Sequence, residues 1–174
     1  YGAARLLNDQ AAVHIRIGDP VQAAHLLQES RKLFERRAPE DRLAARELAE
    51  THHLLARLPL HVAPRPGREA DAVALGREHA QAADALYREL ADRRERARVW
   101  ETLARLELRG ARPERALSLL KAALTQQQRQ GDLIGLARTT ATLADLLAAE
   151  QRLPEALDLL AESVALNLDK GSPL

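Results

Sequence analysis

Apolar residues recur along this chain at the i, i+3 and i+4 spacing of amphipathic helices. Short runs of Gly, Pro and polar residues interrupt this pattern at residues 18–20, 64–67, 110–113 and 151–154. Three of the breaks end in a proline that would open the next helix, where its missing N–H needs no partner: Pro20, Pro113 and Pro154. The pattern therefore predicts eight helices arranged as four antiparallel pairs.

The helix pairs are copies of one another. The sequence ARVWETLARLEL from Ala97 matches ARTTATLADLLA from Ala137, 40 residues later. The second helix of each copy opens with Pro-Glu and continues with Ala-Leu, at Pro113 and again at Pro154. Segments beginning near Ala49 and Ala4 repeat the same pattern with more differences. A fixed period of this length is typical of a solenoid built from stacked repeats.

Pro59 is an exception within the second pair, because it falls inside an otherwise helical run. A proline in a helix removes one hydrogen bond and clashes with the preceding turn. We therefore expect the third helix to kink or end near Pro59, and the link around Pro64 to be the longest.

The repeat resembles the tetratricopeptide repeat, in which a bulky residue, a Leu and a small residue precede a second helix marked by a small residue. These positions are held here by Trp100, Leu103, Ala104, Ala116, Leu120 and Ala123. Glu107 stands where the family usually has an aromatic residue, and Gln128 replaces its usual proline. The longer period resembles the elongated repeats of large bacterial signalling ATPases and transcriptional activators.

This resemblance implies an all-α fold, a right-handed αα-hairpin solenoid of about four helix pairs. Residues 1–174 would form a single array with these approximate repeats: 3–37, 42–91, 94–130 and 133–170. Both ends match inter-repeat linkers, since 171–174 aligns with 131–134 and 1–5 with 134–138, so we expect a fragment of a longer protein. Small residues should let paired helices approach closely: Ala104, Ala116, Ala144 and Ala156.

The net charge of the chain limits the classes of partner that it is expected to bind. Lys and Arg total 26 against 25 Asp and Glu, so the net charge of +1 gives no strong global attraction to nucleic acid or to a membrane surface. Only Lys32, Lys121 and Lys170 are lysines, so nearly all of the basic residues are arginines. The chain has no cysteine, no signal peptide and no apolar run near the ~20 residues that span a bilayer. We expect a cytoplasmic protein with neither nucleic acid nor membrane as a partner.

The sequence carries no recognisable catalytic or metal-binding motif. None of the six histidines are spaced i, i+4, the separation that puts two imidazoles on one helix face for zinc. His52 and His53 are neighbours, and we expect the first to pack like Trp100 and the second to lie at the surface. No serine lies in a nucleophile motif, and 131–135 lacks the lysine of a phosphate loop. We predict no enzyme activity, no cofactor and no metal.

The candidate site is a polar stripe on the first helix of each pair, which in tetratricopeptide arrays lines the concave groove. Arg98, Glu101, Arg105 and Arg109 follow one another at steps of three or four residues. Equivalent positions in the other copies complete the predicted partner-binding face: Arg5, Asn8, Arg16, His53, Arg57, Arg138 and Asp145. By resemblance this mildly basic face would hold a protein or peptide with acidic groups, Asn8 bonding its backbone. Alternatively, the arginines merely solvate the helices and pair with neighbouring acids.

These features favour a protein- or peptide-binding scaffold or sensor segment of a larger bacterial signalling or regulatory protein. The alternative is an architectural spacer or a self-association module that forms a homo-oligomer through its exposed ends. An enzyme of unrecognised type is disfavoured, because the repeat accounts for most of the apolar pattern.

Overall fold

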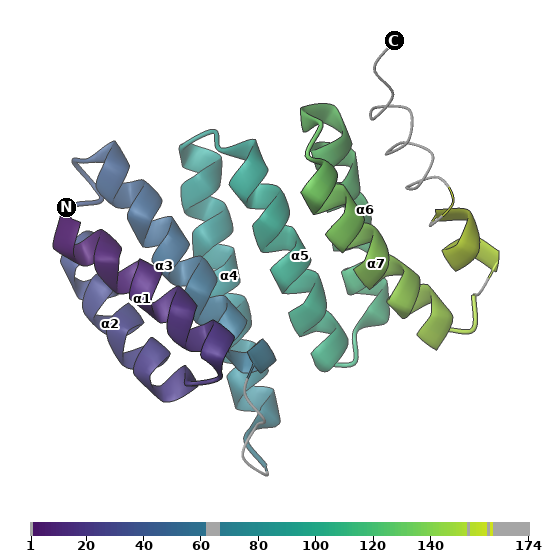
Figure 1. Ribbon diagram of the computed structural model, residues 1–174, viewed down its shortest axis with the longest axis horizontal. Coiled ribbons are helices and arrows are strands. Elements are labelled where there is room, and N and C mark those ends of the chain that lie inside the picture. The colour runs from purple at the N-terminus through teal and green to yellow at the C-terminus, as the bar shows by residue number, and fades with distance from the viewer. Residues whose placement is uncertain (1, 62–66, 153, 160, 162–174) are drawn as a thin grey trace.

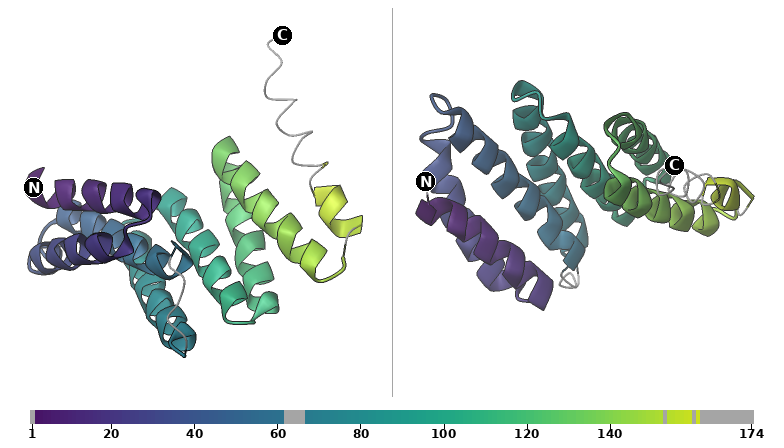
Figure 2. Two further views of the ribbon diagram at one scale, coloured as in Figure 1. Left: turned by 60° about the horizontal axis from the view of Figure 1, so that its bottom comes forward. Right: turned by 45° about the horizontal axis from the view of Figure 1, so that its top comes forward.

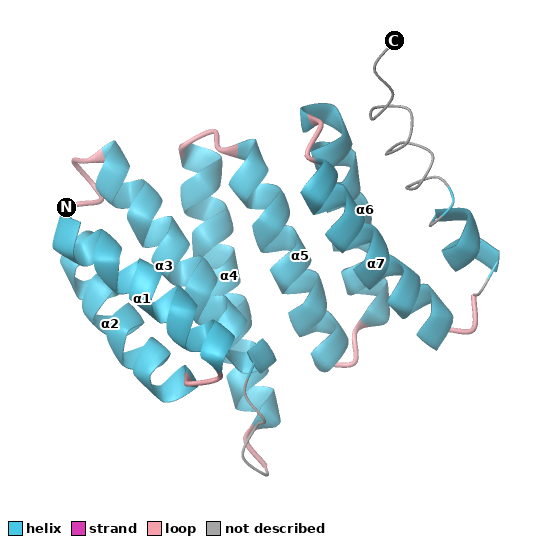
Figure 3. Cartoon of the chain, in the orientation of Figure 1, coloured by secondary structure: helices cyan, strands magenta, loops and turns pink. Residues whose placement is uncertain are grey.

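The computed structural model describes residues 2–61, 67–152, 154–159 and 161, and within them the chain is helical with short turns and no strand (Figures 1 and 3). The helices follow in this order: α1 (Gly2–Ile17), α2 (Pro20–Glu35), α3 (Arg42–His61), α4 (Glu69–Glu89), α5 (Arg93–Arg109), α6 (Pro113–Gln130) and α7 (Leu133–Ala149). Residues 154–159 are also helical. The predicted centre of the long link, at 62–66, and the predicted C-terminal linker, at 171–174, lie outside the described residues.

Each helix packs against the next, and the pairs stack side by side into an elongated array (Figures 1 and 2). The first helices of neighbouring pairs also touch, α1 against α3 and α3 against α5. The prediction of an all-α array of helical hairpins is confirmed. We call the surface formed by α1, α3, α5 and α7 the first-helix face.

Local signals in the sequence fix where the helices begin and end. The side chains of Asp19, Asp92 and Asp132 each accept a hydrogen bond from a backbone N–H in the first turn of α2, α5 and α7. Pro20 opens α2, and Pro113 opens α6. The third helix runs past Pro59 to His61, directly before the residues that are not described, so the kink or end expected near that proline stays a prediction.

Small residues let the helices of the last two pairs pack closely. Ala104, Ala116, Ala144 and Ala156 are all buried in one hydrophobic cluster, which also contains Leu120. Their short side chains allow backbone segments to approach closely while leucines fill the remaining space. The close packing expected from these alanines is confirmed.

Glu107 takes the position that an aromatic residue usually fills in the family, yet its side chain is only 2% exposed. Its carboxylate lies 3.3 Å from Arg77 Nε of α4 and 2.8 Å from Arg112 Nε, just before α6. Gly110 leaves the space that Arg77 occupies, because a Cβ there would collide with the guanidinium group. Two ion pairs therefore compensate the buried charge and link three helices.

Candidate functional site

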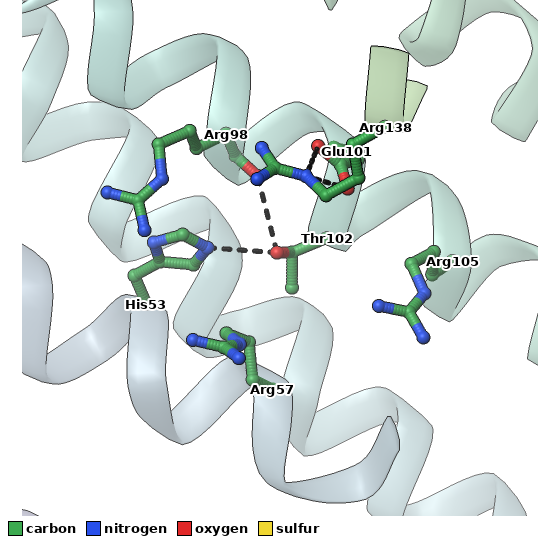
Figure 4. Close-up of a pocket in the computed structure, with 7 residues that line it drawn as sticks. All are labelled: His53, Arg57, Arg98, Glu101, Thr102, Arg105 and Arg138. Atoms are coloured by element: carbon green, nitrogen blue, oxygen red, sulfur yellow. Dashed lines mark hydrogen bonds and ion pairs between the residues drawn. The ribbon is translucent and has the colours of Figure 1, made fainter. Parts of the chain in front are cut away.

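Four arginines surround one cavity of about 130 Å³ on the first-helix face (Figure 4). Arg57 comes from α3, Arg98 and Arg105 from α5, and Arg138 from α7. His53, Glu101 and Thr102 complete the lining. Arg98 and Arg105 are two helical turns apart and so project from the same face of α5. We call these seven residues the basic cavity.

His53 lies in the wall of the basic cavity, between α3 and α5, with only 2% of its surface exposed. Its Nε2 lies 2.9 Å from the hydroxyl of Thr102, and that hydroxyl donates to the carbonyl oxygen of Arg98 at 3.3 Å. Since the threonine proton is used in this way, His53 Nε2–H is the donor to Thr102. Its Nδ1 is buried and has no hydrogen-bond partner among the described residues.

His53 is therefore not the surface residue that the sequence predicted. Because His53 is one residue beyond His52, its side chain leaves α3 in a different direction and packs between the first helices of successive pairs. Burial, and then the charges of Arg98, Arg57 and Arg138, lower the pKa of His53 to about 3. The imidazole is neutral at pH 7, so it adds hydrogen-bonding capacity to the cavity but no charge.

Two of the four arginines have an acidic partner. Arg138 Nε lies 2.7 Å from both carboxylate oxygens of Glu101, and the hydroxyl of Thr139 donates to one of them at 3.4 Å. Arg98 Nη1 donates to Glu95 at 2.6 Å. Glu101 is only 5% exposed, which corrects the expectation of an exposed contact residue. Its carboxylate is used to join α5 to α7.

The other two arginines, Arg57 and Arg105, have no ion-pair partner within the described part of the chain. Burial and the charges of Arg98, Arg105 and Arg138 lower the pKa of Arg57, whereas Glu50 raises it without offsetting them. Uncompensated positive charge therefore accumulates at this point of the first-helix face. A negatively charged group bound there would relieve the repulsion.

A second cavity, of about 310 Å³, lies between α1, α3 and α5 and has a different charge. Arg5 and Arg46 line it together with a larger set of acidic residues: Asp9, Glu47, Glu50 and Glu95. We call it the mixed-charge cavity. The mildly basic character expected of the whole face is therefore wrong for this end of the array, where acidic groups outnumber basic ones.

Asn8 lines the mixed-charge cavity but is only 3% exposed. Its Oδ1 accepts hydrogen bonds from the hydroxyls of Ser30, at 2.8 Å, and Thr51, at 2.9 Å. Its Nδ2 donates to the carbonyl oxygen of Glu47 at 3.2 Å. These bonds join α1 to α2 and α3. The family resemblance predicts that Asn8 bonds the backbone of a partner. This stays a prediction, and to form such a bond Asn8 would have to give up one of these three hydrogen bonds.

The residues of the predicted polar stripe thus fall into three groups: those at the basic cavity, those at the mixed-charge cavity, and those at neither. Six of its residues meet at the basic cavity: His53, Arg57, Arg98, Glu101, Arg105 and Arg138. Arg5 and Asn8 lie at the mixed-charge cavity, whereas Arg16, Arg109 and Asp145 are exposed and line neither.

Sequence reasoning missed Thr102 of the basic cavity and, at the mixed-charge cavity, Tyr87 and these charged residues: Asp9, Arg46, Glu47 and Glu95. The hydroxyl of Tyr87 donates to Glu50 at 3.0 Å, and burial together with Glu50 raises the tyrosine's pKa. Tyr87 lies on α4, a second helix, and the prediction considered only first helices.

Within the part of the chain that the structure describes, no group of three or more His, Asp or Glu side chains is arranged to hold a metal ion. His52 and His79 approach with 3.0 Å between their Nδ1 atoms, but only as a pair. Among the described helices, none combines the length and apolar character needed to cross a bilayer.

Comparison with known proteins supports the fold. No protein-family model and no curated protein sequence matches the chain. Solved structures do match, among them the crystal structure of the Podosopora anserina putative kinesin light chain nearly identical TPR-like repeats and that of a point variant of the same repeats. The first has a TM-score of 0.72 and 20% identity, over 97% of this chain and 76% of that chain. The variant has a TM-score of 0.71 and 19% identity, with the same coverage. At this identity the likeness establishes a TPR-like fold alone.

Proposed function

We propose that the chain is a protein-interaction scaffold whose first-helix face binds a segment of another protein, with an acidic side chain or a C-terminal carboxylate in the basic cavity. One observation carries this proposal. Arg57 and Arg105 face the same cavity without an acidic partner in the described chain, although most other cavity charges are paired. Guanidinium groups form strong, directional hydrogen bonds with carboxylates.

The neighbouring mixed-charge cavity supports an extended ligand rather than a small one. It adjoins the basic cavity across the Glu95–Arg98 ion pair, because Glu95 lines the mixed-charge cavity and Arg98 the basic one. A peptide laid along the first-helix face would therefore meet acidic groups near α1 and basic groups near α7. We expect a partner segment with a basic residue several positions away from its acidic group.

We extend the proposal to the cellular setting: a segment of a larger bacterial signalling or regulatory protein, acting in the cytoplasm. Its support is the resemblance of the elongated repeat to repeats in large bacterial regulators, together with the absence of cysteine from the sequence.

The test is capture of partners from a bacterial lysate by the parent chain and by an Arg57→Glu/Arg105→Glu variant. A variant with Lys121→Glu and Arg129→Glu is the matched control, because it changes the net charge equally at exposed positions of α6, away from the first-helix face and from both cavities. We expect the control to retain the partners and the cavity variant to lose them. Equal capture by the two variants would exclude the basic cavity as the binding site.

Self-association is a second candidate function, favoured by one observation on the opposite side of the array. An apolar groove of about 440 Å³ lies between α2, α3 and α4. Val21 and Leu75 line it and remain 79% and 54% exposed. If two copies meet there, light scattering will show the mass rising with concentration in the parent chain, and Val21→Glu will abolish the rise. A constant monomer mass would exclude this function.

A further inference from the structure

The charges of the basic cavity do not balance. Glu95 compensates Arg98, and Glu101 compensates Arg138. Two guanidinium groups, those of Arg57 and Arg105, remain without an ion-pair partner in the described chain; Glu50, in the mixed-charge cavity, raises the pKa of Arg57 without outweighing burial and the other arginines. A carboxylate brings one negative charge, whereas a phosphoryl monoester brings about 1.5 to 2 at neutral pH. The uncompensated charge therefore corresponds to a phosphoryl group better than to one carboxylate.

The arrangement of the arginines also suits a tetrahedral anion. The four guanidinium groups come from α3, α5 and α7 and lie on different sides of His53 and Thr102 (Figure 4). A carboxylate is planar, so one guanidinium fork satisfies both of its oxygens. A phosphoryl group presents three terminal oxygens in different directions and accepts from donors on several sides. Donors on three helices therefore match its shape.

A histidine in the wall of the basic cavity adds a further hydrogen-bonding atom. His53 is buried, faces the cavity and has an Nδ1 atom without a partner among the described residues. Buried polar atoms of this kind are uncommon and call for a ligand, a water molecule or a functional role. In the Nε2–H tautomer, Nδ1 would accept a hydrogen bond from a water molecule that also donates to the bound anion.

We infer that the basic cavity binds a phosphoryl group carried on a side chain of the partner protein. This inference rests on the proposed function and specifies the partner as a phosphorylated one. Arg57 and Arg105 supply the uncompensated charge, while Arg98 and Arg138, held by Glu95 and Glu101, supply donors in fixed positions. Phosphorylation of the partner would then control its association with this array.

Fluorescence anisotropy with labelled peptide pools tests the inference without knowledge of the partner. Three pools share the same randomised flanking positions and carry phosphoserine, glutamate or serine at the centre. The protein is the full chain, as the parent, as Arg57→Gln/Arg105→Gln, and as a Lys121→Gln/Arg129→Gln control, whose two positions are exposed on α6. Circular dichroism melts establish that each variant is folded. Because neither Arg57 nor Arg105 takes part in an ion pair in the described chain, their replacement breaks none.

We expect the phosphoserine pool to bind the parent about tenfold or more tightly than the glutamate pool, since a phosphoryl group carries about 1.5 to 2 negative charges and three acceptor oxygens, whereas a glutamate carboxylate carries one charge and two oxygens. The cavity variant should lose this preference and the control should keep it. Equal binding of the phosphoserine and glutamate pools, both dependent on Arg57 and Arg105, would overturn the inference and leave the proposed function standing. Binding of neither pool would overturn both.

A second arm separates a phosphorylated partner from a free anion. Inorganic phosphate is titrated into the parent chain while the side-chain Nε–Hε signals of the arginines are followed by NMR. We expect it to bind at least tenfold more weakly than the phosphoserine pool, because only the peptide also contacts the rest of the first-helix face. Inorganic phosphate that binds as tightly as the pool would show a site for the free ion and overturn the inference.

Discussion

Arg138 Nε lies 2.7 Å from both carboxylate oxygens of Glu101, across the contact between α7 and α5. The glutamate side chain is 7% exposed, whereas the arginine side chain is 46% exposed. The pair therefore has two effects. It connects two successive first helices, and it removes one positive charge from the basic cavity.

Replacing Glu101 by Gln should separate these effects. The variant should lose about 1 to 2 kcal/mol of stability, a modest loss because the released Arg138 remains partly solvated. It should also bind anionic peptides more tightly, because a third guanidinium charge becomes uncompensated. Thermal unfolding and anisotropy with an all-glutamate peptide measure the two quantities. Glu155→Gln, which breaks an exposed pair with Arg152 elsewhere, is the control. Weaker peptide binding by Glu101→Gln would contradict the assigned charge balance.

The close contact of helices in the third pair predicts a packing effect. Ala116 has no exposed surface and lies in the cluster with Ala104 and Leu120. Ala116→Leu should overpack this contact and destabilise the fold by about 1 to 3 kcal/mol. Ala141→Leu, at an exposed position on α7, should melt close to the parent. If the two variants melted at the same temperature, the close packing at Ala116 would not limit stability.

The buried histidines predict a loss of stability in mild acid. Burial and nearby arginines lower the pKa of His53 to about 3, and burial and His79 lower that of His52 to about 4. In the unfolded chain both should titrate near 6.5, so below that pH the unfolded state binds more protons than the folded state. Stability is therefore fully present above pH 6.5 and falls as the pH drops toward 4.

Urea unfolding at pH 7.5 and at pH 5.0 measures this dependence. His53→Gln should reduce the difference between the two pH values, because one proton-linked group is gone. His25→Gln, at an exposed position of α2, should leave the difference unchanged. A His53→Gln variant with the full pH dependence of the parent would show that this histidine is not buried in its neutral form.

The fold followed from sequence because its signals are local and repeated. Aspartates and prolines mark helix starts, and Ala97 and Ala137 begin matching segments whose alanines pack as expected. The repeat also predicted that four arginines would lie near one another, because equivalent positions in successive first helices lie side by side: Arg57, Arg98, Arg105 and Arg138.

The burial and pairing within the site were not predictable in the same way. His53 and Glu101 belong to the polar stripe by spacing, yet the packing between successive pairs covers both. The partner of Glu101 is Arg138, far along the chain, and one helical face cannot indicate which acid neutralises which arginine. Asn8 was likewise placed on the correct helix but not in its buried contact with Ser30 and Thr51.

NMR of the arginine side chains tests whether the first-helix face binds a partner through the basic cavity. An all-glutamate peptide is added to the full chain at fixed ionic strength, and the Nε–Hε signals are assigned with single Arg→Lys variants. The signals of Arg57 and Arg105 should shift and saturate together, while that of Arg129, on α6 and outside both cavities, should not move. Small shifts shared by all arginines without saturation, or no shift at Arg57 and Arg105, would contradict a binding site at the basic cavity.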